Sequence, residues 1–514
     1  MRRSWTLYAS LILLVVCANR VSGQTPDSAM VPPTPTVSVT LQEALDQARV
    51  NSPIYRQALN NAGPAGWAVR NAYGNLLPAA DVSSGLRYTG SGEVNRGQGL
   101  TTTTSALLES NWFAGLSYQL DGSRIIGPSQ EKANQKATDK EIENEAVTLR
   151  YNITTQYLIG AATSAQVLVS RQQVERNQSF LDLAQARFRV GQGTLIEVRQ
   201  AEVQKSAADV QLLRDQQAEN EAKLELFRQM GVIPPVPVEQ IALTDSFPVT
   251  EPTLQLEDLL QMAAEENPAL RALRYRESAA SAGVKSAKSA FLPTLQAQAG
   301  WGGFTQRETD ENLLISQSTA GAMGSASSCI SNDSIRVGAG LAPLSTPAGC
   351  NASAGLNSAG TALSPQAHQE LIDLNNKFPF GFTKQPFGMN LTISLPIFTG
   401  FGRSLRLAQA REFEDDAAEN VRAAGLRIQF EVNARYLGLQ TAYKAIGAQA
   451  TSREAARDQL RLAEDRYRLG SGSSLEVTDA QNAVQRAEGD YIAAVFAYHR
   501  ALTILELAVG RPLR

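Results

Sequence analysis

Few residues in this sequence carry the side chains that enzymes use to bind metals or transfer protons. The 514 residues include only two histidines, His368 and His499, and three cysteines, Cys17, Cys329 and Cys350. The histidines lie in unrelated contexts, and we find neither a nucleophile elbow nor a zinc-binding motif. We therefore predict no catalytic residue, no metal site and no cofactor, and we do not expect an enzyme.

The composition excludes two further classes. Hydrophobic residues make up 43% of the chain and charged residues 19%, so the chain can build an apolar core and is not disordered overall. The formal net charge of −3 excludes a generally basic protein that coats nucleic acid, so no nucleic acid is expected as a partner. A structural or transport role is favoured.

One pair of acids has a spacing that could matter. Glu476 and Asp479 are three residues apart, which places both carboxylates on one face of a helix. The matching positions in an earlier, similar segment are Glu197 and Gln200, so only one acid is kept there. An isolated pair of this kind is more often a solvated helix face than a site.

The N-terminus has the layout of a secretory signal peptide. Arg2 and Arg3 precede a short apolar stretch, and small residues come before Gln24, so we predict a signal peptide over residues 1–23. A Pro-rich leader is expected over 24–37. Val16 stands where a lipidation motif requires a small residue, which leaves lipidation of Cys17 open. After Gly23 no apolar run is long enough to predict a transmembrane helix.

The remaining chain is a duplication. Two openings with leucines, an Asn-Pro or Asn-Ser-Pro step and a Leu-Pro step recur 215 residues apart, and the interval from Pro53 to Pro78 equals that from Pro268 to Pro293. A second block, Arg-Phe-Arg-Val-Gly-Gln-Gly from Arg187, recurs 279 residues later as Arg-Tyr-Arg-Leu-Gly-Ser-Gly from Arg466. We predict a first repeat over 38–231, a linker over 232–255 and a second repeat over 256–511. The offsets differ by 64 residues, which assigns the surplus to a Gly/Ser/Ala/Thr-rich loop insert at 306–385.

Each repeat contains two segments in which apolar and polar residues alternate. The alternation predicts strands at about 79–90 and 110–121 in the first repeat, and at about 293–305 and 386–398 in the second. Their length suits transmembrane β-strands, although a soluble antiparallel sheet gives the same alternation. Four strands are too few to close a barrel in lipid, so membrane insertion would require several copies of the chain.

Long helical segments fill the rest of each repeat. Apolar residues at three- and four-residue spacing predict a helical hairpin over about 124–231 and another over about 402–510. Tight turns with two glycines close them, at Val190-Gly191-Gln192-Gly193 and at Leu469-Gly470-Ser471-Gly472. The first helix of each hairpin would be roughly 100 Å long at 1.5 Å per residue.

Together these features resemble the TolC-like outer-membrane efflux proteins. The duplicated openings, the Leu395-Pro396-Ile397-Phe398-Thr399-Gly400 segment and the two Gly-x-Gly turns carry the resemblance, which covers about 38–511. It implies an α+β membrane protein whose duplicated half-repeats form a trimeric twelve-stranded β-barrel with four strands per chain. A long periplasmic α-helical barrel continues this β-barrel.

The resemblance also implies a function, a location and partners. Such proteins are passive exit ducts of tripartite efflux pumps or type I secretion systems, and they reside in the outer membrane of Gram-negative bacteria and extend into the periplasm. The expected partners are two further copies of the chain, a periplasmic adaptor (membrane fusion protein), outer-membrane lipid, and an inner-membrane transporter that is either proton-driven or an ABC exporter. The exported substrate and the transporter class cannot be read from this chain.

The resemblance assigns roles to specific residues. The two Gly-x-Gly turns would be the periplasmic tips that dock the adaptor, and Glu476, Asp479 and Glu197 would form acidic rings at the tunnel entrance. Tyr467 matches a tyrosine of the family's entrance lock, with Gln200 beside it, but Gly472 stands where the best-known member has its lock arginine. The same closing network therefore cannot be assumed.

Two questions remain open in the sequence. In an oxidising exported compartment Cys329 and Cys350 are expected to form a disulfide within the insert, which would face the outside of the cell in a role that the sequence does not define. The main alternative to a duct is an exported coiled-coil scaffold with a soluble sheet and no channel activity. A secreted hydrolase would need a catalytic constellation that we do not find.

Overall fold

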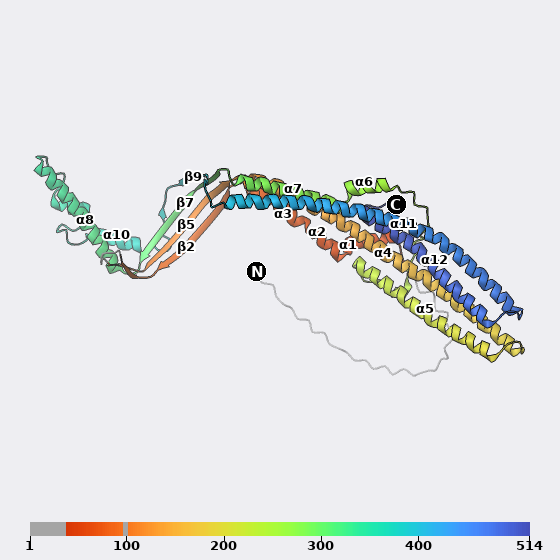
Figure 1. Cartoon of the computed structure of the whole chain (residues 1–514). Helices are drawn as coiled ribbons and strands as arrows, with labels where there is room; N and C mark the ends of the chain where they lie inside the picture. Colours follow the sequence, from red (N-terminus) through yellow and green to blue (C-terminus); the bar gives the residue numbers. More distant parts are fainter. Residues whose placement is uncertain (1–36, 96–100, 514) are drawn as a thin grey trace, which may run out of the picture.

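The computed structural model describes residues 37–95 and 101–513. The predicted signal peptide, the predicted leader up to residue 36 and Cys17 lie outside the described residues. The described chain is a long rod, with a small sheet between a bundle of long helices and a separate helical projection (Figure 1).

The first half begins with strand β1 (Val37–Val39), which pairs in parallel with β6 (Ile241–Leu243). Three short helices follow, α1 (Leu41–Asn51), α2 (Pro53–Asn60) and α3 (Ala62–Gly74). Strand β2 (Ala79–Thr89), the ribbon of β3 (Gly92–Asn95) and β4 (Thr101–Thr104), and β5 (Leu107–Leu120) follow. The helical hairpin consists of α4 (Gly122–Arg189) and α5 (Leu195–Met230), and α4 spans 68 residues.

The second half repeats this order. A linker with the turn η1 (Val238–Gln240) and β6 (Ile241–Leu243) leads to α6 (Leu256–Glu266), α7 (Pro268–Ser289) and β7 (Thr294–Glu308). An insert with α8 (Glu311–Gly338), α9 (Pro347–Ser353) and α10 (Pro365–Asn375) precedes β8 (Thr383–Lys384) and β9 (Gly388–Ser394). The second hairpin consists of α11 (Gly402–Arg468) and α12 (Ser474–Val509).

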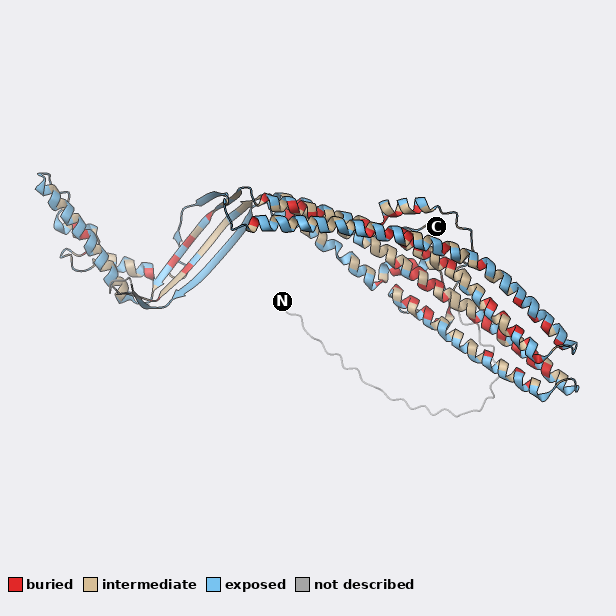
Figure 2. Cartoon of the chain, viewed as in Figure 1, coloured by how far each residue is buried: buried red, intermediate tan, exposed pale blue. Residues whose placement is uncertain are grey.

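The sheet has two chemically different faces. Antiparallel pairing in the order β2, β5, β7, β9 aligns residues in rows such as Tyr118, Ala297 and Leu391 on one face. Rows such as Gln119, Gln296 and Thr392 lie on the other. Figure 2 shows that much of the sheet is exposed in the single chain, whereas buried residues concentrate along the long helices. The sheet therefore needs partners on its apolar face and at its edges.

Strand β9 is shorter than the alternation predicts, since it ends at Ser394 rather than near 398. Pro396 follows two residues later, and its ring nitrogen carries no proton for a ladder hydrogen bond. The apolar residues beyond Ser394 belong to an irregular segment that leads into α11.

The insert is mainly helical, so its prediction as a loop is wrong. Asp310, Thr346 and Ser364 each accept a backbone hydrogen bond at the start of α8, α9 and α10 respectively. Cys329 in α8 and Cys350 in α9 form a disulfide, and Asp333 accepts hydrogen bonds from the backbone of Leu344 and Ser345. Local caps and a covalent link thus order a segment whose Gly/Ser-rich composition is typical of loops.

Helix α12 is long and apolar enough to cross a membrane by length and composition alone. In the structure it packs along α11 and α4. Tyr498, Leu505 and Val509 of its apolar face are buried in the core of the second half. Its apolar face therefore packs against protein within the chain, although the sequence analysis found no apolar stretch of this length after Gly23.

The motifs that recur in the sequence meet in space. Gly231, at the end of α5 with φ 76°, lies so close to the first half's Asn-Ser-Pro step that a Cβ would be 2.5 Å from the Asn51 carbonyl oxygen. Gly510, at the end of α12 with φ 90°, would place a Cβ 2.7 Å from Cδ of Pro268. Both halves therefore seat a short helix on the end of a long one, and only glycine fits the contact.

We predict that Gly231→Ala and Gly510→Ala each destabilise the fold by about 1–3 kcal/mol, because each combines a left-handed backbone with a close contact. The thermal loss of helical circular dichroism in detergent measures the effect. Gly438→Ala in α11 is the control, since a Cβ there meets no atom within 4 Å. If all three variants melt alike, the proposed contacts do not hold the halves together.

Candidate functional site at the helix tips

The two hairpins reverse direction in the same way. Gly191 and Gly470 occupy the left-handed region at φ 76° and 78°. The second glycine of each turn is needed for space instead, since a Cβ on Gly472 would lie 3.0 Å from Cβ of Arg466. At Gly193 the corresponding distance, to Cβ of Arg187, is 3.3 Å. The sequence predicted glycine for a positive φ, which holds only for the first of each pair.

A Ser/Thr-x-x-Glu signature begins both returning helices, and the sequence reasoning above overlooked it. Thr194 and Glu197 form a reciprocal capping box at the start of α5. Ser473 accepts a hydrogen bond from the backbone N–H of Glu476 at the start of α12. Two of the three predicted entrance acids therefore occupy the third position of their helix. There the positive end of the helix dipole also stabilises a carboxylate.

Tyr467 joins the two hairpins just above the turns. Its side chain is 1% exposed, and its hydroxyl donates a hydrogen bond of 3.3 Å to the carboxylate of Glu197 on the other hairpin. Phe180 of α4 packs against the ring with centroids 5.3 Å apart. Burial, together with the nearby Glu197 carboxylate, raises the pKa of Tyr467, so the hydroxyl stays protonated and able to donate.

Arg187 completes this contact, and the sequence analysis did not single it out. Its guanidinium lies over the Tyr467 ring, 4.4 Å from the centroid, and donates to the backbone carbonyls of Tyr467 and Gln192. The repeat could have revealed it, because Arg187 matches Arg466, which lies 3.5 Å from Glu476 and donates to the carbonyl of Ser471. One repeated arginine thus braces each turn.

The remaining predicted residues lie on the same end of the molecule. Gln200 accepts a hydrogen bond of 3.2 Å from the hydroxyl of Ser474, which adds a second link between the hairpins. Asp479 is exposed, one turn beyond Glu476. In the single chain Glu197 is held by its cap and by Tyr467, while Glu476 is paired with Arg466. Asp479 is therefore the most accessible of the three predicted entrance acids.

A buried ion cluster lies further up the hairpins. Glu488 of α12 is 5% exposed and accepts two hydrogen bonds from Arg457 of α11. Arg176 of α4 lies 3.6 Å from the other carboxylate oxygen. Burial lowers the pKa of Arg176, and the Glu488 carboxylate opposes that effect. Because removing one member leaves a buried charge unpaired, this cluster fixes how the two hairpins pack.

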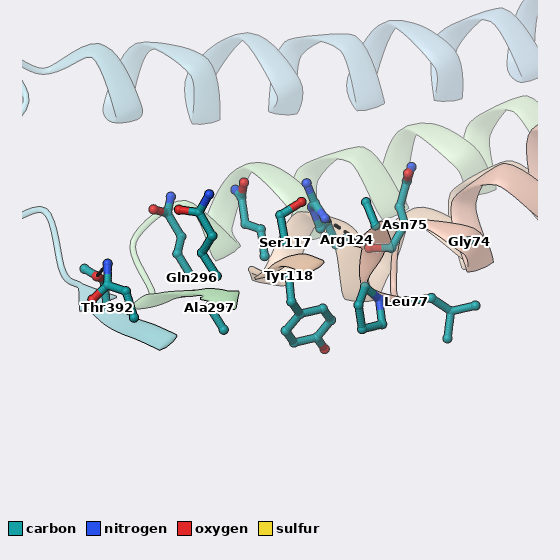
Figure 3. A pocket seen from close by; sticks show the side chains of 14 residues that line it. Gly74, Asn75, Leu77, Ser117, Tyr118, Arg124, Gln296, Ala297 and Thr392 are labelled. Atoms are coloured by element: carbon teal, nitrogen blue, oxygen red, sulfur yellow. Dashed lines mark hydrogen bonds between the residues drawn. The ribbon is translucent and has the colours of Figure 1, made fainter. Parts of the chain in front are cut away.

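A second polar site lies where the sheet meets the helices. A cavity of about 490 Å³ is lined there by residues of the four strands β2, β5, β7 and β9 and by Asn75 and Arg124 (Figure 3). Gln296, Ser117 and Thr392 point to one side of the sheet in this view, while Tyr118 and Ala297 point to the other. Arg124 donates to the carbonyl of Asn75 and pairs with Asp121, which is not part of the lining, so the lining itself carries a positive charge.

One group of potential metal ligands lies within the described residues, formed by Cys329, Asp333 and Cys350. The disulfide removes both thiolates, and Asp333 already accepts two backbone hydrogen bonds. The donor set therefore does not fit a metal ion.

We predict that the Tyr467 contact limits how far the two hairpin tips separate. Spin labels on the exposed residues Val190 and Leu469 report the distance between the tips. Tyr467→Ala should broaden this distance distribution strongly, and Tyr467→Phe less, because only the hydroxyl is lost. Tyr436→Phe is the control, since its hydroxyl bonds the linker carbonyl of Leu254 instead. Identical distributions in all variants would contradict the assignment.

Comparisons with known proteins agree with this architecture. The family model described as "Outer membrane efflux protein" matches residues 351–511. The fusaric acid resistance protein FusA of Burkholderia cepacia is 27% identical over 194 residues, which are 37% of this chain and 36% of that protein. The matched segment thus spans about a third of this curated relative.

Solved structures share the fold over almost the whole chain. A membrane protein from Pseudomonas aeruginosa superposes with a TM-score of 0.65 at 18% identity, covering 93% of this chain and 91% of that one. The outer membrane protein VceC of Vibrio cholerae gives 0.64 at 16%, covering 92% and 97%. The Campylobacter jejuni outer membrane channel CmeC gives 0.66 at 14%, covering 91% and 85%. The fold of the chain is thus shared with solved outer-membrane proteins over more than nine tenths of its length, and residues 351–511 match the family model of outer membrane efflux proteins.

Proposed function

We propose that the protein is the exit duct of an efflux system and works as a homotrimer. Strands β2 and β9 are the two ends of the four-strand order, and each leaves one row of backbone hydrogen-bonding groups without a strand partner in the chain. Lipid cannot satisfy such groups, so the edges must be closed by other copies. This pair of open edges carries the proposal, and three copies would supply the twelve strands that the family implies. The exported scaffold with a soluble sheet is not favoured.

The helices support the same closure. Helix α4 packs against α5 and α12, and α12 packs against α11, so α5 and α11 form the two flanks of the hairpin layer. Helix α5 exposes Ile196, Val203 and Val210 at seven-residue spacing, with 69%, 65% and 47% exposure. Helix α11 exposes Leu462, and Leu469, the cap residue seven positions later, is exposed as well. Two apolar seams on opposite flanks suit head-to-tail packing into a closed ring.

Disulfide trapping tests the ring. Val203 lies eight residues after the start of α5 and Leu462 six residues before the end of α11, so the two are at similar height above the tips. Combined Val203→Cys and Leu462→Cys, in a Cys17→Ser background, should give covalent trimers on oxidation. Val203→Cys with Leu426→Cys is the control, because Leu426 lies many turns higher. Monomers from both pairs, together with a monomeric mass in detergent, would refute the assembly.

The entrance acids are assigned a role in ion passage. In a threefold assembly each acid near the tips becomes three, and a ring of carboxylates attracts cations. Because Asp479 is exposed while Glu197 is held by its cap and Tyr467, Asp479 should dominate. Asp479→Asn should therefore lower the cation-to-anion permeability ratio in planar bilayers, Glu476→Gln less, and Glu197→Gln least. A ratio that is unchanged in Asp479→Asn removes its assigned role.

The gate and the partners complete the proposal. With Gly472 at the position of the family's lock arginine, the contact of Tyr467 with Glu197 and Arg187 is assigned the closing role. The exposed turns at Gly191 and Gly470 suit docking of a periplasmic adaptor, which would connect the duct to an inner-membrane transporter that supplies the energy.

FusA is named for fusaric acid resistance, which favours export of small organic molecules over protein secretion. Loss of the gene with unchanged susceptibility to fusaric acid and other small toxins would argue against that substrate class.

A further inference from the structure

The segment between β9 and α11 presents large apolar side chains to solvent. Ile397, Phe398 and Phe401 are 92%, 74% and 75% exposed in the chain. The rings of Phe398 and Phe401 contact each other edge to face with centroids 5.6 Å apart, so they form one apolar protrusion. We call Leu395–Phe401 the apolar hook.

The hook is held in place by a buried arginine. Arg403 is 8% exposed, and its guanidinium donates to the carbonyls of Ile397 and Ala290 and to the hydroxyl of Thr399. It also stacks on the Phe291 ring at 4.9 Å. One buried cation thus ties the middle of the hook to the end of α7.

The backbone of the hook is strained. Phe401 has φ 62°, and it is the one non-glycine residue with positive φ in the described part of the chain. Such a conformation in a bulky residue costs on the order of 1–3 kcal/mol. Within the described chain, the exposed ring gains little burial that would offset this cost. The conformation therefore serves to present the ring to something outside the chain.

The hook directly follows the strand that carries part of the sheet's apolar face. Met389, Leu391 and Ile393 of β9 lie on that face, and exposed Leu395 and Ile397 follow in the irregular segment after the strand. Exposed Leu77 and Leu292 lie at the neighbouring strand starts, at the same end of the sheet. In the duct, this end faces the periplasm and the apolar face meets lipid.

Cations stacked on aromatic rings lie near the same end, on the helix side. Arg70 lies over the Trp67 ring at 4.7 Å, and Lys132 over the Tyr73 ring at 5.1 Å. All four side chains are exposed. Along the rod, from the sheet towards the helices, apolar side chains come first, and aromatic rings with cations follow. A membrane leaflet has the same order, with acyl chains first, then the interface and then the phosphates.

We propose that the apolar hook and these two cation–aromatic pairs form a lipid-binding collar that anchors the channel in the periplasmic leaflet and prefers anionic phospholipid. The inference rests on the proposed function, because that function places the sheet in the membrane. The hook enters the region just below the headgroups, and Arg70 and Lys132 contact the phosphates. The backbone strain at Phe401 is the free-energy cost of directing its ring towards lipid.

Depth measurements test the hook. The Cys17→Ser protein is reconstituted in phosphatidylethanolamine vesicles containing phosphatidylglycerol, with a spin label on Ile397→Cys, Leu391→Cys or Leu469→Cys. The Leu391 label should contact oxygen and exclude a water-soluble nickel chelate, and the tip label at Leu469 should do the reverse. The Ile397 label should lie between them, near the interface. In Phe401→Gly, which fits the positive φ without strain, it should move towards water.

The outcomes separate the two claims. A water-exposed Leu391 label would refute the membrane placement of the sheet and with it the proposed function. A lipid-exposed Leu391 with a water-exposed Ile397 would overturn the collar alone. So would an Ile397 label broadened by dipolar coupling, since a neighbouring copy would then cover the hook.

The charge preference has its own measurement. Association of spin-labelled phosphatidylglycerol, relative to phosphatidylethanolamine, should fall about fivefold for each of Arg70→Gln and Lys132→Gln, from roughly 1 kcal/mol per charge near the surface. Arg453→Gln is the matched control, because Arg453 also stacks on an aromatic ring, Tyr491 at 3.8 Å, but far along α11. Equal preference in all three variants would overturn the assigned contacts with anionic lipid.

Discussion

The backbone of a membrane-embedded strand must find all its hydrogen bonds within protein, and the rest of this structure depends on that constraint. One chain supplies four main strands and leaves β2 and β9 open at the edges. In the proposed assembly further copies close these edges, and the copies together form the tunnel that the helices surround. The exposed seams on α5 and α11 are the consequence at the helical end, where water replaces lipid and side chains rather than backbone groups must be covered.

The duplication explains how one chain supplies two similar sets of strands and helical hairpins. In each half a short helix is seated on the end of a long helix through a glycine, Gly231 or Gly510, that no side chain could replace without a close contact. The halves then differ where function requires it. Arg187 and Glu197 have counterparts in the second hairpin, whereas Tyr467 stands where the first hairpin has Phe188. The hydroxyl that bonds Glu197 is therefore present in only one copy of the repeat.

Charge is used differently along the rod. At the tips, acids and arginines lie near water, where each pair contributes little stability and can exchange partners. Higher up, Glu488 is buried and is paired with the half-buried Arg176 and the exposed Arg457, and removing both arginines would leave an unpaired charge in the protein. Exposed ion pairs at the tips, below a more buried packing of the hairpins, suit the proposed duct that opens at one end. At the other end Arg403 is buried to hold an apolar segment outward, towards lipid.

The sequence by itself determined the elements and their order, because two-residue and three- to four-residue periodicities are local properties and the duplication shows twice where they change. It also pointed to Tyr467 and the two glycine turns. It did not predict the helices of the insert, whose caps and disulfide act against a loop-like composition, nor the early end of β9. Only the tertiary structure decided that Arg187 lies on Tyr467, that Glu197 is held while Asp479 is exposed, and that Phe401 is strained. Each of these depends on residues far apart in the chain, whose approach no local pattern encodes.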